Sequence, residues 1–167
     1  MKLISEQYRK QNRLLHQSGK NFGHRGHRHL DEIRELMERY ECKDVLDYGC
    51  GKATLSKQAD FLVVSYDPAV PKYEADPPQC DAVVSTDVLE HIEPELIDNV
   101  LRHIRSKMVV AGYFVINTHK DRSKTLPDGT NPHRLIRSAD WWTDKVSEYF
   151  TIENIWQEGQ HIHMVVT

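Results

Sequence analysis

The spacing of apolar residues along the chain predicts alternating helices and strands. Helical spacing, with apolar residues every three or four positions, occurs in residues 3–17 and 30–40 and again after Pro94, and a short helix is expected over residues 51–58. Short apolar runs, which are typical of buried strands, separate these helices. The runs occupy residues 43–47, 61–66, 81–85 and 113–117. The second run is apolar along most of its length, so we expect that strand to be buried on both faces.

The C-terminal third and the order of the elements define the expected sheet. Ser138 is a good N-cap for a helix that carries Trp142, and residues 151–156 and 161–166 predict a hairpin. Alternating strands and helices form a mostly parallel sheet with helices on both faces, whereas a short hairpin must pair antiparallel. We therefore expect a three-layer, Rossmann-like α/β fold with a seven-stranded, mostly parallel sheet and an antiparallel C-terminal hairpin. The seventh strand is expected near residues 73–75.

Length and composition indicate one domain, residues 1–167. A chain of 167 residues is large enough for one sheet between two helical layers and small for an enzyme with a separate substrate domain. The net charge of −3 argues against a surface that binds nucleic acid as a whole. Cys42, Cys50 and Cys80 are odd in number and lack C-x-x-C spacing, which favours reduced thiols in a cytoplasmic protein. No apolar run is long enough to span a membrane.

The most informative stretch is V-L-D-Y-G-C-G-K-A-T-L, residues 45–55. Here a buried strand ends in Asp47 and is followed by Gly49 and Gly51. A second strand ends in Asp67, twenty residues after the first acid. In βαβ units that bind nucleosides, such glycines let the backbone approach the ligand, and the second acid accepts hydrogen bonds from the ribose hydroxyls. The alternatives are an ordinary strand-to-helix turn and, for the second acid, a turn residue before a proline.

The acid and the glycines resemble motif I of class I S-adenosylmethionine (SAM) methyltransferases, D/E-x-G-x-G-x-G, with Ala53 in place of the third glycine. The resemblance extends over residues 28–167, and the stretch L-P-D-G-x-N-x-H at residues 126–133 is similar to small bacterial and phage members of unassigned substrate. It implies a SAM-dependent methyltransferase that moves the methyl group of SAM to an oxygen or nitrogen of an acceptor. The helices of residues 1–40 would then cover the cofactor site.

The resemblance also assigns the cofactor contacts. Asp47 would orient the methionine end of SAM and Asp67 would hold its ribose, while the two glycines would let the chain pass beneath the cofactor. Asp76 would receive the adenine amino group, and Tyr66 or Pro68 would border the ring. The expected cofactor-binding residues are Asp47, Gly49, Cys50, Gly51, Asp67, Pro68, Asp76 and Asp87. The alternative for Cys50 is a small buried residue without chemistry.

A second constellation, D-V-L-E-H-I at residues 87–92, follows the strand of residues 81–85, where α/β sheets place their ligands. Many SAM methyltransferases carry a similar stretch. We expect catalytic roles for Glu90, His91 and His133, because these groups would lie near the transferred methyl. An imidazole titrates near neutrality and therefore suits a general base.

The same stretch raises the possibility of a metal site. Carboxylates together with imidazole suit Mg²⁺ or Mn²⁺, and a metal lowers the pKa of an acceptor hydroxyl. The expected ligands are Asp87, Glu90, His91 and His133. This set resembles the metal-dependent small-RNA 2′-O-methyltransferases, which use two acids and two histidines. In the alternative interpretation, Glu90 and His91 only fix the turn and line the pocket.

Two polar segments are candidates for loops over the site. Residues 118–137 form a long connection with several basic side chains, which we interpret as an acceptor-binding lid that contacts phosphate or carboxylate, or else as a solvated loop. Residues 21–29, N-F-G-H-R-G-H-R-H, are interpreted as a flap over the SAM site or as a solvated linker. Trp142 is expected to pack in the core.

The acceptor is expected to be a small molecule or the end of a nucleic acid, and the sequence carries no signal for a membrane partner or an oligomeric state. A SAM- or nucleotide-binding module without catalysis is a second hypothesis, favoured by Ala53 and the short helix after it. A nicotinamide dehydrogenase is disfavoured because the glycine spacing differs from G-x-G-x-x-G.

Overall fold

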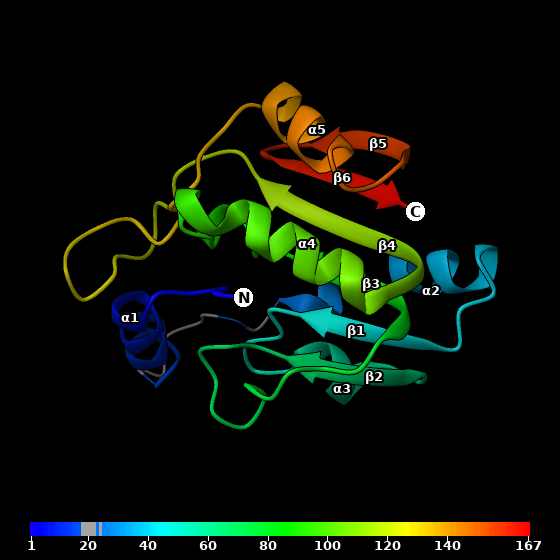
Figure 1. The fold of residues 1–167 in the computed structure, drawn as a ribbon, viewed down its shortest axis with the longest axis horizontal. Coiled ribbons are helices and arrows are strands. Elements are labelled where there is room, and N and C mark those ends of the chain that lie inside the picture. Colours follow the sequence, from blue (N-terminus) through cyan, green and yellow to red (C-terminus); the bar gives the residue numbers. More distant parts are fainter. Residues whose placement is uncertain (18–22, 24) are drawn as a thin grey trace.

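The computed structural model describes residues 1–17, 23 and 25–167, which form three layers with a sheet in the middle (Figure 1). The helices are α1 (Glu6–Gln17), α2 (Leu30–Arg39), α3 (Thr54–Gln58), α4 (Ile97–Lys107) and α5 (Ala139–Ser147). The strands are β1 (Asp44–Tyr48), β2 (Leu62–Tyr66), β3 (Cys80–Thr86), β4 (Met108–Asn117), β5 (Ile152–Glu158) and β6 (His161–Val166). Short 3₁₀ turns are η1 (Gly26–His29), η2 (Leu89–His91) and η3 (Pro94–Leu96).

The strands of the described residues form one sheet in the order β2-β1-β3-β4-β6-β5. Neighbouring strands from β2 to β4 are parallel, and β6 is antiparallel to both β4 and β5. Parallel strands need crossover connections, so helices cover both faces of the sheet. The predicted Rossmann-like α/β fold with an antiparallel C-terminal hairpin is confirmed.

The sheet has six strands in the described part of the chain, rather than the seven that the sequence predicts. Residues 73–75, the predicted seventh strand, lie in a turn in which the N–H of Tyr73 donates to the carbonyl of Val70 at 2.8 Å. Residues 71–78 contain three prolines, which cannot donate to a strand ladder. β2 is therefore an edge strand, and Leu62 is 64% exposed. The prediction that this strand is buried on both faces is wrong.

Two apolar cores hold the helices against the sheet. One face packs on α4 and α5, where Leu101, Ile104 and Trp142 are fully buried. The other face packs on α2 and α3 through Ile33 and Leu55. The prediction that Trp142 packs in the core is confirmed.

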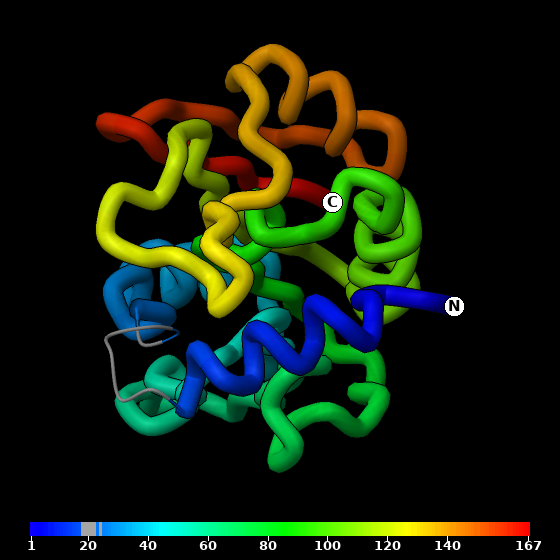
Figure 2. Tube along the Cα trace, turned by 90° about the vertical axis from the view of Figure 1, so that its left-hand side faces the viewer, coloured from blue at the N-terminus to red at the C-terminus, as the bar shows by residue number. Residues whose placement is uncertain are grey.

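The carboxyl ends of the parallel strands meet at one edge of the sheet, which is the end of the molecule seen in Figure 2. The register aligns Asp47 with Ser65 on β2 and with Val84 on β3. Helix α1 and the connection of residues 118–137 lie over this edge. Doubly wound sheets bind their ligands at this edge. Within the described residues, no helix is both long enough and apolar enough to cross a membrane.

Candidate functional site

A cavity of about 320 Å³ lies between the carboxyl edge of the sheet, α1 and the segment that follows β4. Ligand pockets commonly measure roughly 300–1,000 Å³, so this cavity is large enough for a small molecule. Most of the predicted cofactor residues line it. They are Asp47, Gly49, Cys50, Asp67, Pro68 and Asp87. Gly51 shapes the turn beside the cavity, whereas Asp76 lies elsewhere.

The turn after β1 shows why its glycines are needed. Gly49 has φ +84°, and a Cβ there would lie 2.5 Å from Cγ2 of Val88. Gly51 has φ +52°, and a Cβ there would lie 2.7 Å from the backbone of Gly23. Ala53 also adopts a left-handed conformation, with φ 51°, so α3 begins three residues later than predicted. A left-handed residue that carries a Cβ costs about 1–2 kcal/mol, which makes this position locally strained.

Asp67 fixes the glycine turn and remains beside the cavity. Its Oδ2 accepts a hydrogen bond from the N–H of Gly51 at 3.0 Å, and its Oδ1 accepts one from the N–H of Ala69 at 2.8 Å. The Nε2 atom of His16, on α1, lies 4.0 Å from the same Oδ2. Each carboxylate oxygen has a second lone pair, so Asp67 can accept further hydrogen bonds from a ligand.

Asp47 is a buried acid with an unusual pKa. It is only 3% exposed, and its Oδ2 has no hydrogen-bond partner among the described residues. Burial, and then the charge of Asp67, raise the pKa of Asp47 from 3.8 to about 7. A buried charge is costly unless it is paired, so a cationic group in the cavity would stabilise the ionised form.

Cys50 is buried against this turn, and burial raises the pKa of its thiol. A thiol of raised pKa is a poor nucleophile, so the cysteine is a small buried residue in the cavity wall.

Asp76, which the resemblance assigns to the adenine amino group, lies outside the cavity. Its side chain is 71% exposed and accepts a hydrogen bond from Nζ of Lys107 at 2.7 Å. Its other oxygen lies 2.9 Å from Nε2 of His103. The Nδ1 atom of that histidine lies 2.8 Å from the hydroxyl of Tyr48, which lines the cavity. Asp76 therefore binds α4 at the end of a hydrogen-bonded chain, away from a ligand.

Glu90, His91 and His133 lie together, and the two histidines line one side of the cavity. One possible ligand atom from each lies within 4.8 Å of the others. The two imidazole rings meet edge to face, with centroids 4.7 Å apart. The Nδ1 atom of His91 bonds the carbonyl of Pro132 at 3.0 Å, and that of His133 bonds the carbonyl of His119.

The acid of this group is fully buried. Neither oxygen of Glu90 forms a hydrogen bond of normal geometry with a described residue. Burial, and then the charge of Asp87, raise the pKa of Glu90 well above its usual value. Burial, and then His133, lower the pKa of His91 to about 4, so this imidazole is neutral at pH 7.

Asp87 does not join these three residues, which corrects the predicted set of four metal ligands. Its backbone is left-handed, with φ 55°. The carboxylate lies 3.2 Å from Nε2 of His161 at the start of β6. Asn117, at the end of β4, lies 3.1 Å from the same imidazole nitrogen.

Helix α1, within the predicted cover of residues 1–40, supplies a wall of the cavity, and the sequence analysis did not identify the residues that form it. Tyr8, Asn12 and His16 line the cavity at intervals of four residues, which places them on one face of the helix. The hydroxyl of Tyr8 donates to the carbonyl of Pro132 at 3.1 Å. Polar residues at helical spacing were the available signal, although polarity alone does not separate a cavity wall from a solvated face.

The segments interpreted as flap and lid also reach the cavity. Gly23, Arg25 and Gly26 line it, whereas residues 18–22 and 24 lie outside the described residues. Within residues 1–40, α2 packs on the sheet and does not line the cavity. Residues 120–124 line the cavity after β4.

Comparison with known proteins identifies the family. Residues 22–165 match a family model described as "Methyltransferase domain". The chain belongs to this methyltransferase family. The match covers most of the chain and confirms the predicted class I, SAM-dependent methyltransferase. None of the curated protein sequences compared with the methyltransferase matches it.

Solved structures agree on the fold of the methyltransferase. A DhpI–SAH complex superposes with a TM-score of 0.66 at 18% identity, covering 98% of each chain. The 1,6-didemethyltoxoflavin-N1-methyltransferase of Burkholderia thailandensis, solved with 1,6-didemethyltoxoflavin and S-adenosylhomocysteine, gives 0.64 at 15% identity, covering 99% of this chain and 91% of that one. An O-methyltransferase family protein from Burkholderia thailandensis gives 0.59 at 14% identity. The present chain covers 54% of that longer protein, and 83% of this chain is matched.

Proposed function

We propose that the protein transfers the methyl group of SAM to an oxygen or nitrogen of a small acceptor molecule inside the cavity at the sheet edge. The observation that carries the proposal is the pair of buried acids, Asp47 and Asp67, which lie at the carboxyl ends of two adjacent strands and line one cavity. SAM carries an ammonium group and a ribose diol, which complement these two acids. Similar structures contain SAH and SAM, which supports the same cofactor here.

The residues of the turn would orient the cofactor. Asp67 would accept hydrogen bonds from the ribose hydroxyls through the lone pairs that Gly51 and Ala69 leave available. Asp47 would face the ammonium group, whose charge would favour the ionised carboxylate. When bound, SAM supplies an electrophilic methyl on sulfur, so the protein has to orient the acceptor and exclude water.

The acceptor would meet the methyl beside η2 and His133. His91 is neutral at pH 7 and His133 lies beside it, so this pair is placed to take a proton from an acceptor hydroxyl or amine. The carbonyls of Pro132 and His119 hold the two rings by their Nδ1 atoms. This arrangement fixes the direction in which each Nε2 points.

Calorimetry with S-adenosylhomocysteine tests the cofactor site. We expect Asp67→Asn and Asp67→Ala to weaken binding at least about tenfold, which corresponds to one lost charged hydrogen bond. Asp144→Asn, on the exposed side of α5, should leave the affinity unchanged. If the unaltered protein does not bind the compound, the proposal fails. Binding without transfer of a labelled methyl to any acceptor would favour the non-catalytic binding module.

A metal-dependent reaction is a second candidate, favoured by Glu90, His91 and His133. The group fits a divalent cation, because a buried carboxylate without good hydrogen bonds lies beside two imidazoles held by backbone carbonyls. Metal-binding histidines commonly bond a carbonyl through their other nitrogen. These three residues would hold Mg²⁺ or Mn²⁺, which would lower the pKa of an acceptor hydroxyl.

Titration with Mn²⁺ separates this candidate from metal-free transfer. We expect saturable Mn²⁺ binding to the SAH-loaded protein, measured by electron paramagnetic resonance. Glu90→Gln should weaken the Mn²⁺ affinity at least about tenfold. Asp87→Asn should change the Mn²⁺ affinity much less, because its carboxylate lies beside His161. Equal Mn²⁺ affinity in Glu90→Gln and the unaltered protein would refute the metal site.

A further inference from the structure

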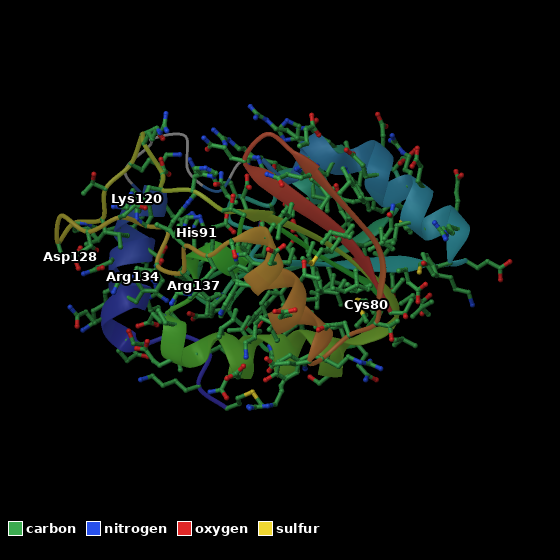
Figure 3. All side chains as sticks on the ribbon, turned by 90° about the horizontal axis from the view of Figure 1, so that it is seen from above. Cys80, His91, Lys120, Asp128, Arg134 and Arg137 are labelled. Atoms are coloured by element: carbon green, nitrogen blue, oxygen red, sulfur yellow. The ribbon has the colours of Figure 1, made fainter. Side chains whose placement is uncertain are left out.

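Basic side chains gather on one part of the cavity wall. Lys120, Arg122 and Lys124 follow β4 at alternate positions, and all three line the cavity. Arg25 joins them from the segment before η1. Figure 3 labels Lys120 and His91 at the same end of the molecule, far from Cys80 at the other end. The wall formed by these four residues is called the basic wall.

The position of the basic wall follows from the order of the strands. Asp67 follows β2 and Asp47 lies at the end of β1, and these are the acids assigned above to the cofactor. Next along the sheet edge come β3 and then β4, and the basic segment follows β4. A cofactor that extends from β2 to β1 therefore directs its methyl end towards β3 and β4. The basic wall borders the space left for the acceptor.

Three side chains of the basic wall have no acid within ion-pair distance. Among the described residues, the side chains of Arg25, Lys120 and Arg122 form no ion pair and no hydrogen bond to another side chain. At longer range, burial raises the pKa of Asp87, whereas His161, His91 and then Arg25 lower it. Asp121, the acid within the segment, accepts hydrogen bonds from the N–H of Ser123 at 2.7 Å, from its hydroxyl at 2.8 Å and from the N–H of Lys124 at 3.2 Å. Its carboxylate therefore shapes the turn.

Hydrogen bonds from the side chain of Asn131 stabilise the turn that carries these side chains. The side-chain amide of Asn131 donates to the carbonyl of Asp121 at 2.8 Å, and its oxygen accepts the N–H of the same residue at 3.3 Å. Burial lowers the pKa of Lys124; Asp121 opposes this effect, and nearby Arg25 adds to it. Close positive charges of this kind are stabilised by an anion between them.

The geometry points to an acceptor that carries an oxyanion group, either phosphate or carboxylate, held by Arg25, Lys120 and Arg122 while the methyl is transferred to another atom of the same small molecule. This inference rests on the proposed function, because it takes the cofactor to lie at β2 and β1. A small molecule is favoured over a nucleic acid because α1 covers the cavity and contacts loops on both sides. Ser5 N–H donates to Glu93 at 2.8 Å, and Arg13 bonds Glu74 at 2.8 Å.

Nuclear magnetic resonance titrations of the SAH-saturated protein test the basic wall. Inorganic phosphate and acetate are added in separate titrations at low ionic strength, where screening is weak. We expect the amide signals of residues 118–124 to shift with saturable binding of at least one anion. The double variant K120Q/R122Q should weaken that binding at least about tenfold, with SAH affinity unchanged within about twofold. The anion that binds with the higher affinity, phosphate or acetate, identifies the oxyanion group of the acceptor.

The matched control is R39Q/K43Q, which likewise removes one arginine and one lysine charge, but at the opposite edge of the sheet, before β1. It should bind the anions as the unaltered protein does. Absence of saturable binding, or equal binding by K120Q/R122Q, would overturn the inference. A short 5′-phosphorylated oligonucleotide that binds more than about tenfold tighter than phosphate would overturn the small-molecule part. If the unaltered protein does not bind SAH, the proposed function is refuted. The anion titration of the SAH-free protein would then still test the basic wall.

Discussion

Replacement of Asp47 by asparagine tests whether a buried charge destabilises the free protein. Burial and Asp67 raise the pKa of Asp47 from 3.8 to about 7. An acid with a raised pKa in the folded state holds its proton more tightly when folded, so unfolding free energy falls as pH rises from about 4 to about 7. The full difference in pKa corresponds to roughly 4 kcal/mol. Above pH 7 the acid is ionised in both states, and its effect is constant.

The experiment compares urea unfolding at pH 5 and pH 8 without cofactor. From Asp47 alone, we expect the unaltered protein to lose about 2–3 kcal/mol of unfolding free energy between these pH values. Asp47→Asn cannot ionise, so its loss should be smaller by that amount. Asp144→Asn, an exposed change in α5, should leave the pH dependence as it is. Parallel pH profiles for the unaltered protein and Asp47→Asn would refute the reasoning.

Asp47→Asn should stabilise the free protein at pH 8 relative to the unaltered protein but weaken its binding of SAH. If Asp47 faces the ammonium group of the cofactor, Asp47→Asn should weaken SAH binding at pH 8 at least about tenfold in calorimetry. Binding by the unaltered protein should weaken as pH falls below about 7, because protonation removes the charge. A variant that becomes more stable and loses affinity would show a site that sacrifices stability for binding.

Two further substitutions test the packing around the site. Ala53→Gly should raise the unfolding free energy by about 0.5–1 kcal/mol in urea, because relief of the left-handed alanine outweighs the stabilisation of the unfolded chain by the added entropy of glycine; an unchanged or lower value would contradict the strain. Trp142→Ala should lower the unfolding free energy by about 3–5 kcal/mol, since the ring is fully buried, and the partly buried Trp141→Ala should cost less. Equal losses would contradict the assigned packing.

The sequence predicted the sheet well where the signal was local. Apolar runs located β1, β3 and the C-terminal half of β4, which begins at Met108 rather than at residue 113, and the short turn before His161 determined the antiparallel hairpin. Apolar content did not reveal which strand lies at the edge, because this depends on pairing between distant segments. The run of residues 61–66 is apolar, yet no strand covers its outer side in the described structure.

The residues of the site likewise divide into those with a local sequence signal and those that depend on pairing of distant segments. The glycine turn and the pair Glu90–His91 are local motifs, and His133 was recognised through a resemblance that extends over its own segment. The partner of Asp87 is His161, which lies far along the chain and reaches it only through the pairing of β6 with β4. A surface acid in a loop looks the same in sequence whether it faces a ligand or a lysine, so the sequence did not show that Asp76 bonds Lys107 outside the cavity.

The order of strands in the sheet explains how a chain with a net charge of −3 presents acids and bases to different parts of one ligand cavity. Because β1 lies between β2 and β3, the cavity meets Asp67, Asp47 and Asp87 in that order, and the basic segment comes after them at β4. Under the proposal above, the reversal of the sign of charge along one edge would place the cationic cofactor and the anionic acceptor at different positions in the cavity. Net charge averages over these positions, so it does not report this polarity. The two ligands would therefore be oriented mainly by the topology of the sheet, with each side chain contributing a charge at a position that its strand determines.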